Sequence, residues 1–262
     1  MNDPVSKSIQ LTEKALAKNA NKEVVLPEWP TPKRATPNAF LRSALFSAIQ
    51  SKDRIFLDRA ILASQEGITV KFTGKQLNQE DLTLWETLVH LAKTQPLGNI
   101  CEFTAYDILK TMGHGDSGEE REILHEGIIR LGACMVEILV NGKNTYFSSL
   151  VDHGVKNEET GHYTIQLSKS LIKLYAQNTW VDFKQRANLK RKPLAQYLHG
   201  YYSSHKAPYP VKIETIYKLS GSKTKRVTDF KKKAIIALDV LVEIGFLVSY
   251  EIDEDRINVK KK

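Results

Sequence analysis

The sequence lacks the features of a membrane-spanning, secreted or disulfide-stabilised protein. Its apolar runs, such as residues 234–238, are far shorter than the roughly 20 residues that a transmembrane helix needs. The first 14 residues hold charged side chains with no apolar block between them, so we expect no signal peptide. There are only two cysteines, Cys101 and Cys134, and both lie in apolar segments, which is typical of reduced, buried thiols. These absences favour a cytoplasmic protein.

Side chains suited to metal or nucleotide chemistry are also scarce. The seven histidines include no His-x-His pair and no H-E-x-x-H pattern, so we expect no metal site. Residues 113–118 fit G-x-G-x-x-G, but a helix rather than a strand is expected before them, which argues against a dinucleotide site. Residues 221–224 resemble the end of a phosphate-binding loop but lack the glycine directly before the lysine. We therefore expect no cofactor and no enzymatic site.

Positive charge is present in excess, and it is unevenly distributed. The formal net charge of the 262 residues is +8. Residues 1–183 hold 20 Lys and Arg against 22 Asp and Glu, whereas residues 184–262 hold 18 against 8, a net charge of +10. The surplus gathers in clusters at 190–192, 223–226 and 231–233. Clustered basic residues favour a polyanionic partner, most often nucleic acid, over a merely solvated surface.

The N-terminal part is expected to be an extended arm followed by a short helix. Four prolines between positions 27 and 37 exclude a helix there. Apolar residues at helical spacing predict a short helix from Asn38 to about Ala48. Alternation over 68–72 predicts a strand that ends at Gly74, and leucines at helical spacing predict a helix over 80–93 that residues 95–98 close.

A pattern of helices and strands then occurs twice. In the first copy we expect a short helix that stops at Gly113, a longer helix over 118–133, and strands over 135–140, 145–151 and 162–167. In the second copy we expect helices near 194–201 and 213–219, a long helix capped by Ser222 or Thr224 that runs to about 244, and a hairpin of 246–251 and 256–260. This order is that of a winged helix-turn-helix domain.

We therefore predict an α+β chain of tandem winged-helix domains with an extended N-terminal arm. The expected parts are an arm and short helix over 1–60, a first winged-helix domain over 61–180, and a second over 181–262. The first domain is expected to make protein contacts, to dimerise and to add auxiliary DNA contacts. The second is expected to be the main DNA reader.

The candidate DNA contacts lie in the second copy. The long helix of the first copy begins with Glu119 and Glu120, which would repel phosphate. In a helix-turn-helix the N-terminal residues of the second helix meet base edges, and Arg and Lys donate to guanine, so Lys225, Arg226 and Thr228 are the candidate base contacts. The other candidate DNA contacts are basic residues nearby in the sequence and on the hairpin: Lys190, Arg191, Lys192, Lys223, Lys231, Lys232, Lys233, Arg256 and Lys260.

Several segments together resemble the TrfA family of plasmid replication initiators. They cover nearly everything from about residue 26 to the C-terminus: residues 28–30 (EWP), 37–46 (PNAFLRSALF), 72–77 (FTGKQL), Trp85, 96–98 (PLG), 103–106 (FTAY) and 202–210 (YSSHKAPYP). The resemblance implies a tandem winged-helix protein that binds direct repeats (iterons) in a plasmid origin. It also implies opening of an adjacent AT-rich segment, contact with single-stranded origin DNA, and recruitment of host initiator proteins, helicase and polymerase clamp.

The resemblance further implies a homodimer in solution that binds the repeats as a monomer. One departure concerns the clamp. Some family members carry a Gln-Leu-Ser-Leu-Phe type of clamp-binding peptide just before the Trp-Pro block, where this chain has residues 22–26 (KEVVL). Residues 166–168 (QLS) match only three positions of that peptide.

Two alternatives to an initiator stay open on the sequence. One is a winged-helix transcriptional repressor of its own gene. The other is an enzyme that nicks DNA for rolling-circle replication, for which Tyr201 and Tyr202 lie beside His199 and His205 in the sequence. Such an enzyme would need a tyrosine nucleophile together with metal-binding histidines.

Overall fold

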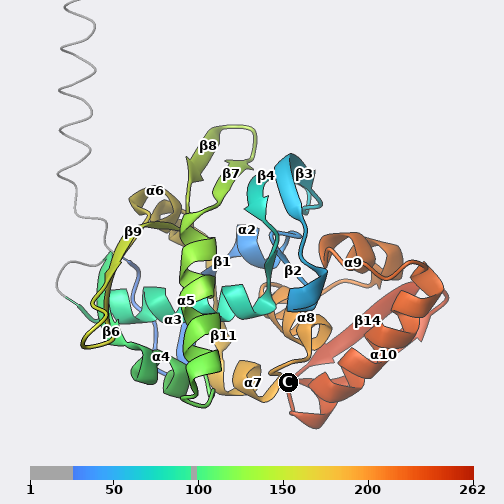
Figure 1. Ribbon diagram of the computed structural model, residues 1–262. Coiled ribbons are helices and arrows are strands. Elements are labelled where there is room, and N and C mark those ends of the chain that lie inside the picture. The colour runs from blue at the N-terminus through green and yellow to red at the C-terminus, as the bar shows by residue number, and fades with distance from the viewer. Residues whose placement is uncertain (1–25, 96–98) are drawn as a thin grey trace, which may run out of the picture.

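The computed structural model describes residues 26–95 and 99–262, and the fold is mixed α/β (Figure 1). The expectations for residues 1–25 and 96–98 lie outside this part of the chain. The buried apolar residues of the described chain form two clusters, one from Leu26 to Val181 and one from Leu189 to Val259. Figure 1 shows the second half, coloured orange to red, beside the first.

The prediction of an extended N-terminal arm is wrong for the described residues. Strand β1 (Lys33–Pro37) pairs antiparallel with β11 (Asn178–Asp182), and β2 (Phe46–Ser47) pairs parallel with β5 (Leu77–Asn78). Trp29 is buried and donates its indole N–H to His90 Nδ1 at 3.0 Å. The prolines exclude a helix but not a strand at a sheet edge, so this segment joins the first core.

The helix expected over 38–48 is only one turn long. Helix α2 spans Asn38–Leu41 and ends because the backbone after it bonds to other segments. The amide of Ala44 donates to Ala63 at 2.7 Å, and that of Ala48 donates to Ser220 at 2.7 Å. A 3₁₀ turn, Ser51–Asp53, follows.

The repeated order of elements is present in the described chain. The first half has α3 (Gln79–Lys93), β6 (Ile100–Thr104), α4 (Ala105–Thr111), α5 (Gly118–Gly132), β9 (Val151–Lys156) and β10 (His162–Leu167), and the second has α8 (Pro193–Ser203), β12 (Val211–Lys212), α9 (Ile213–Leu219), α10 (Val227–Glu243), β13 (Leu247–Asp253) and β14 (Arg256–Lys261). In both halves the first strand pairs with the last, giving the orders β6-β10-β9 and β12-β14-β13.

The first half differs by an inserted hairpin. Strands β7 (Met135–Val140) and β8 (Asn144–Ser148) join β3 (Phe56–Leu62) and β4 (Ile68–Lys75) in a sheet of order β3-β4-β7-β8. The sequence predicts the hairpin but assigns it to the repeated unit, and it misses β3 and β9. The alternation of polar and apolar residues shows which face of a strand is buried, but it does not show which strand pairs with it. This explains the error.

The two halves meet through buried polar side chains. Short elements α6 (Lys169–Ile172), Lys173–Ala176 and α7 (Phe183–Asn188) lead into the junction. From α7, the fully buried Arg186 forms an ion pair with Glu86 at 3.1 Å and donates to the carbonyl of Gln79 at 2.9 Å and that of Gln196 at 3.4 Å. Arg186 therefore joins α3 of the first half to α8 of the second.

Candidate nucleic-acid interface

The start of α10 differs from the prediction. The helix begins at Val227 with Arg226 as its N-cap residue, and Arg226 makes no side-chain capping bond within the described chain. Ser222 and Thr224 do not cap it. Instead the Thr224 hydroxyl accepts from Lys233 Nζ at 3.1 Å, and its carbonyl accepts from the Tyr217 hydroxyl at 2.8 Å. Residues 222–226 therefore form a structured turn, which places Lys223 and Lys225 on that turn rather than on the helix.

The three candidate base contacts lie together and face solvent. Lys225, Arg226 and Thr228 are all exposed at the turn and the first helical residues. The Arg226 side chain is 75% exposed and its Nε pairs with Asp229 at 2.8 Å, a geometry that leaves the two terminal guanidinium nitrogens free to turn toward a base edge. The helix N-terminus adds a positive dipole end at the same place.

The basic character of α10 is confined to its first half. Lys232 and Lys233 are exposed one turn after Thr228, but Asp239 and Glu243 occupy exposed positions further along. A duplex lying along the whole helix would meet these carboxylates. The helix is therefore suited to insertion of its N-terminal end into a groove.

The β13–β14 hairpin borders this surface. Lys231 Nζ donates to the carbonyl of Glu254 at the hairpin tip, at 3.0 Å, and Arg256 is exposed at the first residue of β14. The tip itself, residues 253–255, is acidic. Arg256 is the basic residue that directly follows this tip.

The structure does not bring every candidate to this surface. Lys190 is half-buried and donates to the carbonyl of Gly113, in the first half, at 3.0 Å. Arg191 is exposed with a positive φ of 62°. Lys260 lies near the other end of β14, where the neighbouring Lys261 Nζ donates to the carbonyl of Tyr202 in α8 at 3.1 Å.

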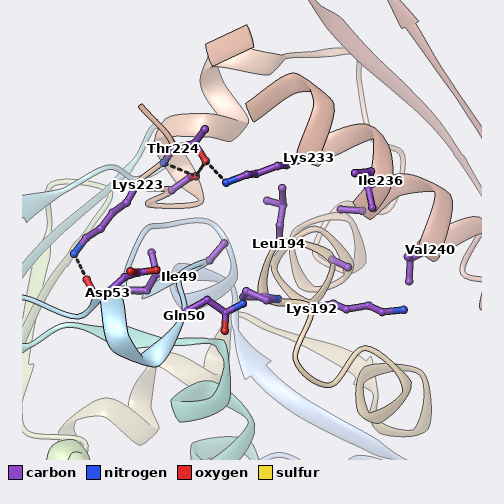
Figure 2. Close-up of a pocket in the computed structure, with 15 residues that line it drawn as sticks. Ile49, Gln50, Asp53, Lys192, Leu194, Lys223, Thr224, Lys233, Ile236 and Val240 are labelled. Carbon is purple, nitrogen blue, oxygen red and sulfur yellow. Dashed lines mark hydrogen bonds between the residues drawn. The ribbon is translucent and has the colours of Figure 1, made fainter. Parts of the chain in front are cut away.

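A cavity of about 470 Å³ lies between α8, α10 and residues 48–53 (Figure 2). Its apolar wall includes Leu194, Ile236 and Val240, and its lining also includes Lys192, Lys223 and Lys233. Figure 2 shows Lys233 turned toward Thr224 and Lys223 turned toward Asp53, so the lysine ammonium groups do not converge on one point. The cavity separates the middle of α10 from residues 48–53 of the first half.

Removing the Lys233 charge should weaken binding to all DNA sequences alike. Lys233 is exposed and lies on the same helix as the base-reading candidates, where an ammonium group meets phosphate rather than a base edge. Lys233→Ala is expected to reduce the slope of log affinity against log salt by about one unit. Mobility shifts on cognate and unrelated duplexes at several salt concentrations check this, with Lys218→Ala on α9 as a control. A loss confined to the cognate duplex would instead make Lys233 a base contact.

Helix α5 of the first half, which corresponds to α10, has acidic residues in its first turn and a side-chain N-cap. The Ser117 hydroxyl accepts from the amide of Glu120 at 3.2 Å at the start of α5. His114 lies between Glu80 and Glu120, 3.8 Å and 3.0 Å away, and these two carboxylates raise the pKa of His114. This helix start offers no counterpart of the basic surface on α10.

Of the four side chains that a nicking enzyme could use, Tyr201, Tyr202 and His199 are buried and His205 is half-buried. His199 and Tyr202 are fully buried, and burial lowers the pKa of His199 to about 3. Burial also raises the pKa of Tyr202. Among the described residues, no group of three His, Cys, Asp or Glu side chains is arranged to hold a metal ion. Cys101 and Cys134 are free and buried, as expected, and burial raises the pKa of Cys101 to about 12 and that of Cys134 to about 11.

One basic groove was missed by the sequence analysis. It has a volume of about 1020 Å³ and is lined by the start of β11, the end of α8 and the end of β14. Trp180 is 52% exposed there, and the lysines that line the groove are Lys206, Lys260, Lys261 and Lys262. The sequence signal for it is weak. Trp180 follows Thr179 and precedes Val181, and alternation along a strand places Trp180 on the face opposite to Val181.

Within residues 26–95 and 99–262, no helix combines the length and the apolar character needed to cross a bilayer.

Comparison with known proteins agrees with the resemblance noted above. The model of the family described as TrfA protein matches residues 8–261. The plasmid replication initiator protein TrfA of Escherichia coli is 25% identical over 240 residues, which cover 89% of this chain and 63% of that protein. The chain therefore spans less than two thirds of the length of this curated relative.

Two crystal structures of domains 2 and 3 of RctB are similar in fold. They give TM-scores of 0.58 and 0.54 with 14% and 15% sequence identity. The matches cover 86% and 84% of this chain and 98% and 95% of those chains. At such identity the likeness shows the fold alone.

Proposed function

The chain belongs to the TrfA family, and from that premise we propose that it is a plasmid replication initiator that binds direct repeats (iterons) at a plasmid origin. The observation that carries the proposal is the start of α10, where Lys225, Arg226 and Thr228 are exposed together at the end of a helix bordered by a hairpin. Arg and Lys at such a position read base edges in the major groove.

In this proposal both halves are winged-helix units, and β9–β10 and β13–β14 are their wings. The support is the shared order of elements and the shared strand order of their sheets. The second half reads the repeat through α10. The first half, with its acidic α5, makes mainly protein contacts and adds auxiliary DNA contacts.

The proposed mechanism is non-enzymatic and uses binding energy to open the origin. Contacts from a helix and a wing bend and strain a duplex, and AT-rich DNA next to the repeats deforms at low cost. The burial of His199 and Tyr202 supports this mechanism over DNA nicking, because a tyrosine nucleophile must reach a phosphodiester. Host initiator proteins and the host helicase would then load on the opened DNA in the bacterial cytoplasm.

We also propose that the chain is a homodimer in solution and a monomer on DNA. The outer face of the β3-β4-β7-β8 sheet offers a surface for the second copy. Register places Ile61, Lys71, Glu137 and Phe147 in one row across all four strands, and Ile61 and Phe147 are 73% and 64% exposed. Exposed apolar side chains on a sheet face are typical of a protein contact.

A replication assay separates an initiator from a repressor. The gene is supplied alone with a replicon that carries the DNA flanking it, and footprinting identifies the protected repeats. An initiator sustains the replicon and protects repeats in it. A protein that protects only its own promoter and does not sustain the replicon would be the winged-helix repressor instead.

Single-stranded origin DNA is proposed as a second ligand, and the groove at Trp180 supports it. Proteins that hold single strands combine a basic groove, which follows the backbone, with an aromatic side chain on which bases stack. The groove has four lysines and a half-exposed tryptophan, and it lies away from the start of α10. A duplex bound by α10 therefore leaves this groove open.

Titration with oligo(dT) should quench the fluorescence of Trp180, because the other two tryptophans, Trp29 and Trp85, are buried. Trp180→Ala is expected to weaken oligo(dT) binding by about 1–3 kcal/mol, the stacking contribution of one base. Trp180→Phe is the matched control, since it removes the signal and keeps a stacking ring. Quenching that persists in Trp180→Phe would contradict this site, whereas binding of the repeat duplex should stay unchanged in both variants.

A further inference from the structure

The turn between α9 and α10 rests on the first half of the chain. The amide of Ala48 donates to the carbonyl of Ser220 at 2.7 Å, and Lys223 Nζ donates to the carbonyl of Asp53 (Figure 2). Ser47 and Ser220 are both fully buried at this contact. The turn that leads into α10 is therefore held by residues 47–53, which run from the end of β2 through the 3₁₀ turn.

Gly221 is the point of closest approach. It has a φ of +60°, and a Cβ atom on it would lie 2.4 Å from Ser47 Oγ and 2.9 Å from Ser47 Cβ. Ser47 cannot simply rotate away, because its hydroxyl donates to the carbonyl of Ala44 at 2.9 Å and accepts from Gln76 Nε2 at 3.1 Å. A side chain at position 221 must therefore move the turn away from the first half.

Beyond this turn, a cavity separates α10 from the first half. The cavity of about 470 Å³ lies between the middle of the helix and residues 48–53, so that packing is not continuous along it. Other close contacts between the halves involve α7 and α8: Arg186 pairs with Glu86, Gly200 meets Leu41, and Arg42 Nε donates to Ser204 Oγ at 3.0 Å. These contacts hold α7 and α8 but do not reach the turn before α10.

We propose that Gly221 is a positioning residue for DNA recognition. Its contact with Ser47 fixes the start of α10 relative to the first half, so that both halves meet one stretch of duplex with a set spacing. The inference rests on the proposed function. Hydrogen bonds to base edges tolerate displacements of only tenths of an ångström. If the turn were displaced, one half would be misaligned with the DNA whenever the other half was correctly bound.

A pair of alanine variants in the full-length chain tests the proposal. Gly221→Ala and Gly245→Ala both place a side chain at a positive φ, of +60° and +70°, in the same half. No described atom lies within 4 Å of a Cβ at position 245, so only Gly221→Ala meets Ser47. We expect Gly221→Ala to lose hydroxyl-radical protection at one end of the repeat and at least about tenfold in affinity. Gly245→Ala should keep the complete footprint.

A second substitution distinguishes positioning from a folding defect. Ser47→Gly removes both atoms that lie within 3.0 Å of the added Cβ. The double variant Ser47→Gly with Gly221→Ala should therefore regain the complete footprint, and the melting temperature of each variant is measured alongside. Equal footprints for Gly221→Ala and Gly245→Ala, or no recovery in the double variant, would overturn the inference.

The test also separates the two levels of the proposal. If the unaltered chain protects no repeat in DNA flanking its gene, the proposed initiator function fails. If it protects repeats and Gly221→Ala protects them equally well, only the positioning role of Gly221 fails.

Discussion

Replacing Arg186 with methionine is expected to lower the free energy of unfolding by about 3–5 kcal/mol, because it leaves the buried Glu86 carboxylate without its ion-pair partner. The Arg186 guanidinium lies 3.1 Å from Glu86, and neither side chain is exposed to solvent. The substitution also removes the hydrogen bonds to Gln79 and Gln196 that join the two halves. Chemical denaturation followed by circular dichroism measures the change.

An exposed ion pair provides the control. Lys33 and Asp182 lie 2.8 Å apart on β1 and β11, and both are partly exposed. Lys33→Met should cost about 1 kcal/mol or less, because solvent screens such a pair. Adding Glu86→Gln to Arg186→Met should recover part of the loss. A loss for Arg186→Met as small as that for Lys33→Met would show that the buried pair is not what joins the halves.

Replacing Arg226 with alanine is expected to weaken binding to the cognate repeat by about 1–3 kcal/mol and to relax the preference at one base position. The guanidinium is lost from the N-cap position of α10, and the Asp229 carboxylate, which is 2.8 Å from it, loses its partner next to the DNA. Mobility shifts on the cognate repeat and on its single-base variants measure both effects.

The matched control lies on the neighbouring helix. Lys218 also forms an exposed ion pair, with Glu214 on α9 and again at 2.8 Å, so Lys218→Ala removes a similar charge and a similar pair. It should leave base preference unchanged. If Arg226→Ala bound the cognate repeat normally and kept its base preference, the reading end of α10 would have been wrongly assigned.

The helices of this protein were predictable because each buries one face. Periodicity places α3, α4, α5, α9 and α10 within a few residues of their observed ends. The start of α10 was predicted too early. Two hydroxyl residues precede it, at 222 and 224, but their hydroxyls bond to each other at 3.1 Å, so the helix starts later, at Val227.

Strand pairing and contacts between segments far apart in the sequence were not predictable in the same way. Nothing in the alternation of residues 135–148 tells which strands they join, and nothing in residues 33–37 indicates a partner 149 residues later in the chain, as in the pairing of Lys33 with Asp182. The burial of Arg186 and the exposure of Trp180 follow from such partnerships. Both invert the usual rule that charge lies outside and apolar rings inside.

Candidate contacts that are close in sequence proved easier to place than those that are far apart. Lys225, Arg226 and Thr228 lie within one turn, so a single local structure places all three. Lys190 and Lys260 were grouped with them by charge alone. The structure directs Lys190 to the carbonyl of Gly113 and places Lys260 on the rim of a different groove.

The two long helices that follow a turn, α5 and α10, begin in chemically opposite ways. At α5 a serine hydroxyl accepts from the backbone amide three residues on, so the positive end of that helix is already neutralised from within the chain. At α10 the corresponding position is an arginine that makes no capping bond within the described residues. An intramolecular acceptor and a phosphate oxygen compete for the same amides. The residue ahead of each helix thus differs in whether it occupies the first amides of that helix, and we expect an exchange of Ser117 and Arg226 to move this difference from one repeat to the other.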